Sequence, residues 1–596
     1  MVLNTFASFA GIFKPGLSRE ERARFRGAIE RNRGFEMDSA AVFEGRSSLV
    51  FCFPLPKAAE AHNPTETGGA CILSFRAGVI SREGCSQTSG DPAYDFSSPG
   101  SAMKEFSGSW ALADIEEERI TLARDSAGAY TVYHGVKDGV FHFTTSLTWF
   151  NGIDFSIDPE GVVDFLHFLY IPSPRTIFKG VESVLPGQTV SYDGRALRKE
   201  AFSRNSFEED DFAAEHKVPE AEYLKAYEEL LKKSVQRACP KNGKAALFLS
   251  GGKDSSTLAI AVKLAGLENI EAVTLGFDEK NIDETEDARV VAKHLGIPFV
   301  PLRFSPLTYL EGLRGFAGSM GQPFGDPAAI PLYAALKQNK DRFDVYIDGT
   351  GNDRYLGIPV TWQEDLAWKI NQKIPGLNHL PWWRLGEGFS YSADVLRRTL
   401  SRPREEQFVS WKGWTDKEIF RLTGRRPDWS GHLLYRLYSD TRTPMEHKTR
   451  TLCEIWEPEA AFRKTVQIAN ALGKTVRFPF LDRDLVRYSE RLPSALKYRG
   501  SVNKVIIRML LEKYLPREIV TKKKGTFNFP KDYILATNNY ECLRLFLSEE
   551  AVRKHNLVDH SMVSGYVERY IKGETVYQDR LWALVLLHSW LEFGRH

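Results

Sequence analysis

The pattern of hydrophobic and polar positions differs between two parts of the chain. Up to Phe202, short alternating runs are broken by glycine and proline, and examples are ACILSFRAGVI, GSWALADIE, ERITLARDSAG and GVFHFTTSL. Alternation with a period of two is typical of strands with one buried face, so this part is predicted to form β-strands and hairpins.

From Glu220 onward the pattern changes to helices and strand–helix units. Glu220 to Ala238 carries apolar residues at helical spacing, and strand–helix units follow over 244–265, 270–295 and 343–356. Strands that alternate with helices predict a parallel sheet with helices on its faces. Beyond about residue 360, helical patterns dominate.

The length of the chain and a polar segment between the two patterns predict separate domains. A chain of 596 residues exceeds what one hydrophobic core supports. The acidic, polar stretch from Ser203 to Glu220 reads as a linker. We therefore expect an N-terminal domain at 1–202, a linker at 203–220 and a second domain at 221–596.

Composition and charge exclude several classes of function. The chain is 42% hydrophobic and 26% charged with a net charge of +2, which argues against a nucleic-acid partner. No apolar run reaches bilayer length, so no membrane span is expected, and MVLNTFASFAGIFKPG lacks the pattern of a secretory signal. Six scattered cysteines without a CxxC pair favour a reducing cytoplasm over a disulfide framework or a zinc site.

One segment, KAALFLSGGKDSS at residues 244–256, predicts a site for an anion. The apolar run from Ala245 to Leu249 has the length of a strand, Ser250 to Gly252 form a turn, and a helical pattern starts at Lys253. Glycines let the backbone approach a ligand closely, and the first N–H groups of a helix point at it. No Gly-Lys-Ser/Thr closes the segment, so it is not a Walker A loop.

This segment matches the SGGxDS pyrophosphate loop of ATP pyrophosphatases, and further motifs follow it in register. Together they give the chain a resemblance to the asparagine synthetase B family over nearly its full length. The matching segments are Ser250 to Ser256 (SGGKDSS), Asp283 to Gly296, Asp348 to Asp353 (DGTGND), Arg477 to Asp482 (RFPFLD), Lys504 to Arg508, and Lys522 to Phe527 with Pro530.

The resemblance implies a fold and a reaction. The fold would be an N-terminal Ntn-hydrolase-like αββα domain of glutaminase type, followed by an ATP-pyrophosphatase-type parallel α/β sheet with a helical extension. The enzyme would be an AMP-forming carbon–nitrogen ligase that adenylates a carboxylate, with ATP and Mg²⁺ required. The residues that would bind the nucleotide are Ser250, Gly251, Gly252, Asp254, Ser255, Ser256, Leu275, Gly349 and Gly351, and those that would bind the metal are Asp254 and Asp353.

The same resemblance supplies catalytic candidates. Lys524 would neutralise the α-phosphate and the oxyanion formed when an amine attacks the acyl adenylate, and Lys522 would contact phosphate. Thr350 stands where glutamine-dependent relatives carry Glu and β-lactam synthetases carry Tyr. A threonine hydroxyl is no base at neutral pH, so the group that accepts the amine proton stays open, with Glu364 and Glu387 as guesses.

The N-terminal half departs from the family at the residues that release ammonia from glutamine. Ala7 stands where the family has its nucleophilic cysteine, Val2 follows Met1, and no cysteine precedes Cys52. Without a thiolate or hydroxyl nucleophile at the chain start there is no covalent route to glutamine hydrolysis. This half is therefore expected to fold as a degenerate glutaminase domain that makes no ammonia.

The leading functional hypothesis is a lasso peptide cyclase, which joins the N-terminal amine of a peptide to an Asp or Glu side chain as a macrolactam. Such enzymes share the degenerate N-terminal half, and the aromatic- and arginine-rich region near 360–415 would line a wider cavity. The expected partners are a leader-free precursor peptide and a companion leader peptidase. The alternatives are a β-lactam or carbapenam synthetase with a small amino-acid substrate, an asparagine synthetase-like amide ligase, a tRNA-modifying pyrophosphatase and a pseudoenzyme scaffold.

Overall fold

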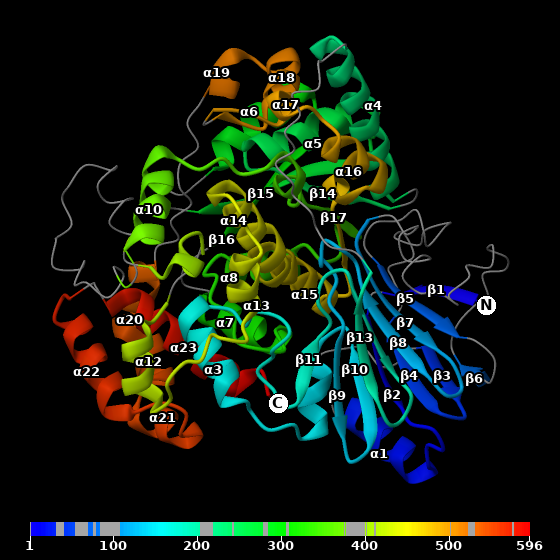
Figure 1. Cartoon of the computed structure of the whole chain (residues 1–596), viewed down its shortest axis with the longest axis vertical. Helices are drawn as coiled ribbons and strands as arrows, with labels where there is room; N and C mark the ends of the chain where they lie inside the picture. Colours follow the sequence, from blue (N-terminus) through cyan, green and yellow to red (C-terminus); the bar gives the residue numbers. More distant parts are fainter. Residues whose placement is uncertain are drawn as a thin grey trace.

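The computed structural model shows an N-terminal part built on stacked sheets and a C-terminal part built on a parallel sheet with many helices (Figure 1). It describes residues 2–6, 8–30, 41–53, 70–75, 79–83, 108–202, 218–240, 243–277, 284–304, 309–374, 376, 400, 402–409, 413–500, 502–521, 531–574 and 577–595.

Two sheets pack face to face in the described N-terminal part. The first runs in the order β1 (Val2–Phe6), β5 (Ala70–Phe75), β7 (Trp110–Ile115), β8 (Ile120–Arg124), β12 (Gln188–Tyr192) and β13 (Leu197–Ala201). The second runs in the order β11 (Val181–Ser183), β9 (Tyr133–Lys137), β10 (Val140–Thr144), β2 (Ser8–Phe13), β4 (Ser48–Phe53), β3 (Ala41–Gly45) and β6 (Val79–Glu83). Neighbouring strands are antiparallel except for β5 and β7.

The alternation along β2 explains how these layers pack. Phe9 and Phe13 point toward the first sheet, where the Phe13 ring meets Tyr192 at a centroid distance of 6.5 Å. Ala10 and Ile12 point the other way and pack beneath α1 (Arg19–Glu30). Because side chains alternate between the faces of a strand, one strand serves both the core between the sheets and the helix outside them.

The C-terminal sheet is parallel and has the order β16 (Phe299–Phe304), β15 (Ile270–Phe277), β14 (Ala245–Phe248), β17 (Val345–Ile347) and β18 (Thr475–Arg477). The chain starts in the middle at β14, adds strands on one side, and then returns to the other side of β14. The strand order therefore reverses between β14 and β17, and the carboxyl ends of these two strands form the crevice where such sheets bind ligands.

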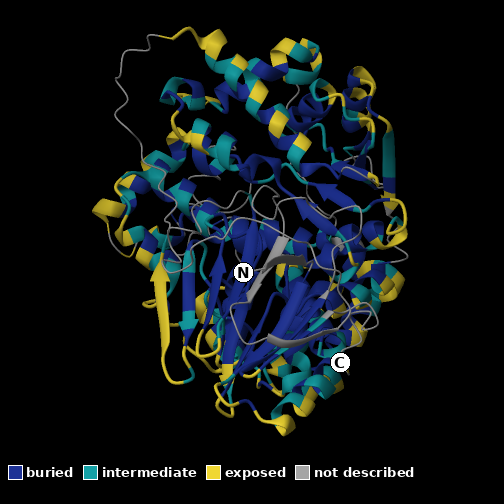
Figure 2. Ribbon diagram, turned by 90° about the vertical axis from the view of Figure 1, so that its right-hand side faces the viewer, coloured by how far each residue is buried: buried dark blue, intermediate teal, exposed yellow. Residues whose placement is uncertain are grey.

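Helices cover both faces of this sheet, and its central strands β14 and β17 are largely buried (Figure 2). Ala245 and Leu247 face one core, formed with α4 (Glu220–Ala238), α5 (Lys253–Leu264), α6 (Thr285–Leu295) and α18 (Val505–Tyr514). Ala246 and Tyr346 face the other core, formed with α7 (Tyr309–Ser319), α8 (Ala329–Gln338) and α15 (Arg463–Ala471). Strands with apolar residues on both faces are expected in a covered parallel sheet.

The remaining helices extend the C-terminal part, except α3, which belongs to the N-terminal part of the chain. They are α3 (Pro159–Phe168), α9 (Asp353–Leu356), α10 (Trp362–Lys373), α12 (Asp416–Thr423), α13 (Leu433–Ser439), α14 (Pro444–Arg450), the π-helix η8 (Thr451–Phe462), α16 (Arg483–Glu490), α17 (Ser494–Lys497), α19 (Arg517–Thr521), α20 (Lys531–Phe546), α21 (Glu549–His555), α22 (His560–Ile571) and α23 (Gln578–Phe593). None of the helices in the described ranges has the length and apolar character needed to cross a bilayer.

These elements confirm the fold class expected from the sequence. The helix predicted over Glu220 to Ala238 is α4, and the predicted strand–helix units correspond to β14–α5, β15–α6 and β17–α9. The domain boundaries at 202 and 221 stay predictions, because most of the expected linker, 203–217, lies outside the described residues.

Buried ion pairs join the N-terminal sheets to the C-terminal part. Arg124, at the end of β8, lies 3.1 Å from a carboxylate oxygen of Glu459 in η8, and Arg463 pairs with the other oxygen. All three side chains are buried. Nearby, the Tyr130 hydroxyl donates to the carbonyl of Val476 in β18 at 3.0 Å. These contacts hold the ends of the N-terminal strands against the helix that leads into α15.

Replacing Arg124 with Ala should destabilise the whole protein, because the buried Glu459 carboxylate would lose one of the two arginines that balance its charge. Removal of one partner from a buried ion pair costs about 3 to 5 kcal/mol. Calorimetry at one fixed scan rate should show a clear fall in Tm. Arg46→Ala is the matched control, since Arg46 pairs with Glu117 on the surface and such pairs contribute about 0 to 1 kcal/mol. Equal Tm values for the two variants would contradict the structural role of the buried pair.

Candidate active site

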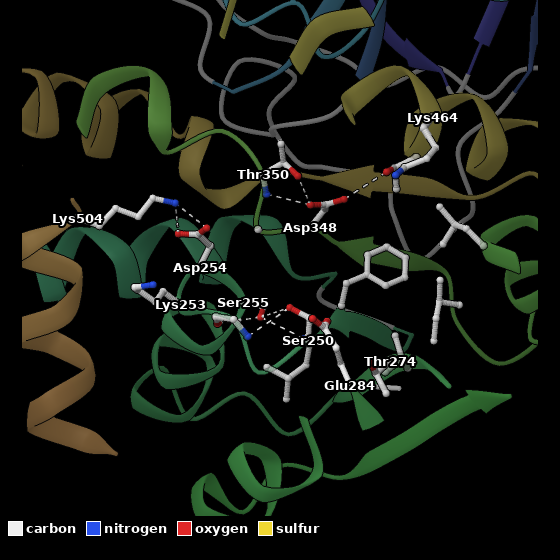
Figure 3. Close-up of a pocket in the computed structure, with 18 of the residues that line it drawn as sticks. Ser250, Lys253, Asp254, Ser255, Thr274, Glu284, Asp348, Thr350, Lys464 and Lys504 are labelled. Carbon is white, nitrogen blue, oxygen red and sulfur yellow. Dashed lines mark hydrogen bonds and ion pairs between the residues drawn. The ribbon is translucent and has the colours of Figure 1, made fainter. Parts of the chain in front are cut away.

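A cavity of about 510 Å³ opens at the carboxyl ends of β14, β15 and β17 (Figure 3). It lies at the crevice where the strand order reverses, which is the usual ligand site of an open parallel sheet. The residues that line it are Phe248, Leu249, Ser250, Gly252, Lys253, Asp254, Ser255, Val273, Thr274, Leu275, Glu284, Leu332, Asp348, Gly349, Thr350, Lys464, Thr465, Asn503 and Lys504.

The turn between β14 and α5 is held by its own serines. Ser255 Oγ accepts a hydrogen bond from the Ser250 backbone N–H at 3.2 Å and donates to the Gly252 carbonyl at 3.1 Å. Gly252 is the N-cap of α5 and offers no side chain to the first N–H groups of the helix. The first turn of α5 thus presents backbone N–H groups and the positive end of the helix dipole, both of which favour an anion.

Glycine is required at one point of this turn. Gly251 has φ +69°, and a Cβ there would lie 2.8 Å from the Cβ of Asp287. Both the left-handed backbone and the close approach exclude other residues without a shift of α6. Gly251 thus shapes the turn from behind and does not line the cavity.

The Lys504 ammonium group lies between two carboxylates. Its Nζ is 2.7 Å from an oxygen of Asp254 and 3.0 Å from an oxygen of Asp353. The side-chain amide of Asn352 also donates to Asp254, at 2.7 Å. Lys504 is only 6% exposed, and its backbone has φ 56°, a left-handed conformation that is unfavourable for lysine. The surrounding structure thus holds this lysine in a strained position at the start of α18.

The charges in this triad fix its protonation states. Burial by itself lowers the pKa of Lys504, but the charges of Asp353 and Asp254 outweigh it, so its pKa is raised above the ordinary value and the amine is charged at neutral pH. Burial raises the pKa of Asp353, and the Lys504 charge opposes that shift. The ammonium of Lys504 therefore favours the ionised form of the two carboxyl groups that it contacts.

A second polar group lines the side of the cavity next to α15. The Asp348 carboxylate follows β17, and one of its oxygens accepts hydrogen bonds from the Thr350 hydroxyl at 2.6 Å and from the Thr350 backbone N–H at 2.9 Å. Its other oxygen accepts from the Thr465 hydroxyl at 3.3 Å. Beside it, Lys464 pairs with Asp326 at 2.6 Å. Figure 3 shows Asp348 and Thr350 together on the side of the cavity toward Lys464.

The structure brings most of the predicted nucleotide residues into this cavity. Its lining includes Ser250, Gly252, Asp254, Ser255, Leu275, Gly349 and Thr350. The other predicted residues lie behind the lining. Ser256 is buried within α5, Gly351 packs against Leu481, and Asp353 reaches the site through Lys504.

Several predicted residues lie outside the described part of the chain. These are Lys522 and Lys524, Glu387, and Ala7 at the expected position of the glutaminase cysteine, and their roles stay predictions. Glu364 is described. It completes a capping box with Thr361 at the start of α10 and pairs with Lys448 at 2.9 Å, away from the cavity lining.

Sequence reasoning missed the contributions of Lys504, Asp348 and Lys464 to the cavity. The Lys504 to Arg508 segment was recognised as a family motif, but nothing in it indicated that its first residue would meet Asp254 and Asp353. Asp348 opens the DGTGND segment, and its position directly after an apolar strand is the signal that would have identified it.

The two aspartates are chemically suited to a magnesium ion. Mg²⁺ prefers oxygen ligands and is usually held by one or two carboxylates together with substrate phosphates. Asp254 and Asp353 provide such carboxylates within reach of one ammonium group. Each carboxylate has about four lone-pair sites, so the bonds to Lys504 leave acceptor capacity for an ion.

Replacing Lys504 with Met should make the stability of the protein fall as pH rises. Without the ammonium, the pKa of Asp353 would move further above its ordinary value of 3.8, because burial and the Asp254 charge both raise it. A carboxyl group whose pKa is raised by folding stabilises the native state below its unfolded pKa and loses this contribution as pH rises toward the folded value. The loss of Tm relative to the wild type should therefore be larger at about pH 7.5 than at about pH 4.5.

Lys513→Met is the control for this comparison. Lys513 forms an exposed pair with Glu228 and should change stability by about 1 kcal/mol or less. If the Lys504→Met variant lost the same Tm at both pH values, the ammonium would not be what opposes the rise in the pKa of Asp353.

Comparison with known proteins agrees with this geometry. Residues 226–592 match the asparagine synthase family model, and residues 96–203 match that of the glutamine amidotransferase domain. The chain is 23% identical over 483 residues to asparagine synthetase [glutamine-hydrolyzing] 1 of Bacillus subtilis, covering 78% of this chain and 74% of the relative. It is also 23% identical over 516 residues to a putative asparagine synthetase [glutamine-hydrolyzing] of Mycobacterium tuberculosis, covering 81% of this chain and 75% of the relative.

Among solved structures, NH3-dependent NAD synthetase from Campylobacter jejuni covers 33% of this chain and 99% of its own, with 13% identity and a TM-score of 0.19. The asparagine synthase model spans more than half of the sequence, including the Ser250–Ser255 turn and Lys504. The protein therefore belongs to the asparagine synthase family.

Proposed function

We propose that the protein is an ATP-dependent amide ligase that activates a carboxylate as an acyl adenylate and transfers the acyl group to an amine. The observation that carries this proposal is the buried Lys504 ammonium between Asp254 and Asp353, directly beside the Ser250–Ser255 turn. One cavity thus combines a backbone site for a pyrophosphate with a fixed cation and two carboxylates suited to magnesium.

The proposed first step is attack of a substrate carboxylate on the α-phosphorus of ATP. The bond between that phosphorus and the bridging oxygen to the β-phosphate breaks, and pyrophosphate leaves. The backbone N–H groups at the start of α5 would bind the leaving pyrophosphate. Lys504 would counter the negative charge that builds up around the α-phosphorus, which is the kind of interaction that lowers a barrier most. Magnesium held by Asp254 and Asp353 would neutralise phosphate oxygens.

The amine is proposed to come from a source other than glutamine. This proposal rests on Ala7, which replaces the cysteine that glutamine-hydrolysing relatives use, and on the absence of another cysteine before Cys52. The N-terminal sheets nevertheless pack tightly against the C-terminal part through Arg124 and Tyr130. We therefore assign this half a structural role in the proposed enzyme.

The finer proposal is that the acyl and amine groups belong to one peptide, which the enzyme closes into a macrolactam. An adenylating site without an ammonia source supports cyclisation, and the segment near 360–415 adds aromatic and arginine side chains to the C-terminal half. The peptide would have to be held folded, with its amine next to the activated carboxyl group. A small amino acid closed on itself, or an amide ligase with two separate substrates, is the competing outcome.

ATP consumption in the presence of a panel of acids tests the reaction class. The panel contains L-aspartate and synthetic peptides with a free N-terminal amine and one internal Asp or Glu, each with ATP and magnesium. We expect AMP and pyrophosphate in equal amounts with at least one acid, and Asp254→Asn should reduce both by about two orders of magnitude or more. Asp341→Asn, an exposed position before β17, is the matched control and should retain the activity.

Mass spectrometry of the same mixtures identifies the product. A peptide that loses one water and becomes resistant to amine labelling would support macrolactam formation. Conversion of aspartate or a small amino acid, with all peptides left linear, would favour the competing outcome. Release of ADP and phosphate would overturn the reaction class, and release of glutamate from added glutamine would overturn the proposed source of the amine.

A further inference from the structure

Amide formation at this site needs a group that takes a proton from the attacking amine. The carboxylates that line the cavity in the described residues are Asp254, Glu284 and Asp348. Asp254 is bonded to Lys504 and Asn352, so its charge is committed to the triad. Figure 3 places Glu284 beside Thr274, near Ser250, whereas Asp348 lies with Thr350 on the side toward Lys464.

The hydrogen bonds of Asp348 leave one of its oxygens better placed to accept a proton. One oxygen accepts two short bonds from Thr350, at 2.6 Å from the hydroxyl and 2.9 Å from the N–H. Within the described ranges, the other accepts only the Thr465 hydroxyl at 3.3 Å, a long bond for an O–H donor. Thr350 therefore fixes the orientation of the carboxylate, and the second oxygen keeps acceptor capacity at the cavity wall.

We propose that Asp348 is the general base of the amide-forming step and that Thr350 is the positioning residue that holds it. This inference rests on the function proposed above and names the group that accepts the amine proton. The hydroxyl of Thr350 donates a hydrogen bond to Asp348, so it orients the base and does not itself accept the proton of the amine.

Amide formation by this route transfers one proton to the base and releases AMP. The lone pair of the neutral amine forms the C–N bond to the carbonyl carbon of the acyl adenylate, and one N–H proton passes to the carboxylate of Asp348. The bond between the carbonyl carbon and the phosphate oxygen then breaks, and AMP leaves with the electron pair. A base that is fixed within reach of the nitrogen contributes roughly 100-fold to 10,000-fold to such a step.

The test separates adenylation from amide formation. Adenylation is followed as acid-dependent exchange of labelled pyrophosphate into ATP, with the acid from the panel that releases the most pyrophosphate. Asp348→Asn should keep this exchange within a few-fold of the wild type but lower amide formation by about 100-fold or more. The deficit should shrink as pH rises, because solvent hydroxide then replaces the missing base.

Hydroxylamine provides a second readout. Its nitrogen is weakly basic, so the adduct that it forms with the acyl adenylate loses its N–H proton readily to water. It should therefore trap the acyl adenylate of Asp348→Asn and of the wild type at similar rates. Asp348→Glu should restore part of the amide formation. Asp344→Asn, at the opposite end of β17, is the control and should change neither step.

A matched pair at Thr350 tests the positioning role. Thr350→Ser keeps the hydroxyl that bonds Asp348 and should retain most of the amide-forming rate. Thr350→Val keeps the shape without the hydroxyl and should lower that rate while exchange continues.

The outcomes distinguish this proposal from the one it rests on. Loss of exchange and amide formation together in Asp348→Asn would show that Asp348 serves the fold or the nucleotide, and would overturn its role as the base. Full amide formation in that variant would overturn it as well. Absence of acid-dependent exchange in the wild type would overturn the proposed ligase itself.

Discussion

The ion triad of Lys504, Asp254 and Asp353 is the interaction on which the rest of the site depends. It connects the first turn of α5, the start of α9 and the residue that precedes α18, so three separate segments are held by one ammonium group. Lys504 has a left-handed backbone, which is unfavourable for a lysine. Its charge is buried, which would be costly without the two carboxylates. The fold therefore fixes the position of the Lys504 ammonium relative to the Ser250–Ser255 turn before any substrate binds.

The N-terminal half supports this triad from the side. Arg354 follows Asp353 in the chain, and its guanidinium donates to the carbonyl of Ala127 at 3.2 Å and to that of Cys453 at 2.7 Å. It also pairs with Glu457 of η8 at 3.2 Å. Burial raises the pKa of Glu457 to about 7, and the Arg354 charge opposes that shift. The N-terminal part thus contacts the residue next to Asp353 and helps to hold the triad in place.

Much of the fold could be predicted from the sequence, because periodicity and turn residues act locally. The helix from Glu220 to Ala238 and the turn at Ser250 to Gly252 lie where their patterns place them. The role of Lys504 could not be predicted in this way, since it meets Asp254 across 250 positions of the chain. The hydrogen bond between Thr350 and Asp348 spans only two positions of the chain. Its place in the cavity could not be predicted locally, because α15 lines the same cavity from a distant part of the sequence.

The most direct measurement of the central claim, that this cavity activates a carboxylate by adenylation, is the transfer of a heavy-oxygen label. The acid substrate is labelled in its carboxylate oxygens and incubated with enzyme, ATP, magnesium and amine, and the AMP is then analysed by mass spectrometry. The account predicts that one labelled oxygen appears in the phosphate of AMP for each amide formed, because the carboxylate attacks the α-phosphorus. Unlabelled AMP would contradict this claim. Label in inorganic phosphate derived from the γ-phosphate of ATP would contradict it as well.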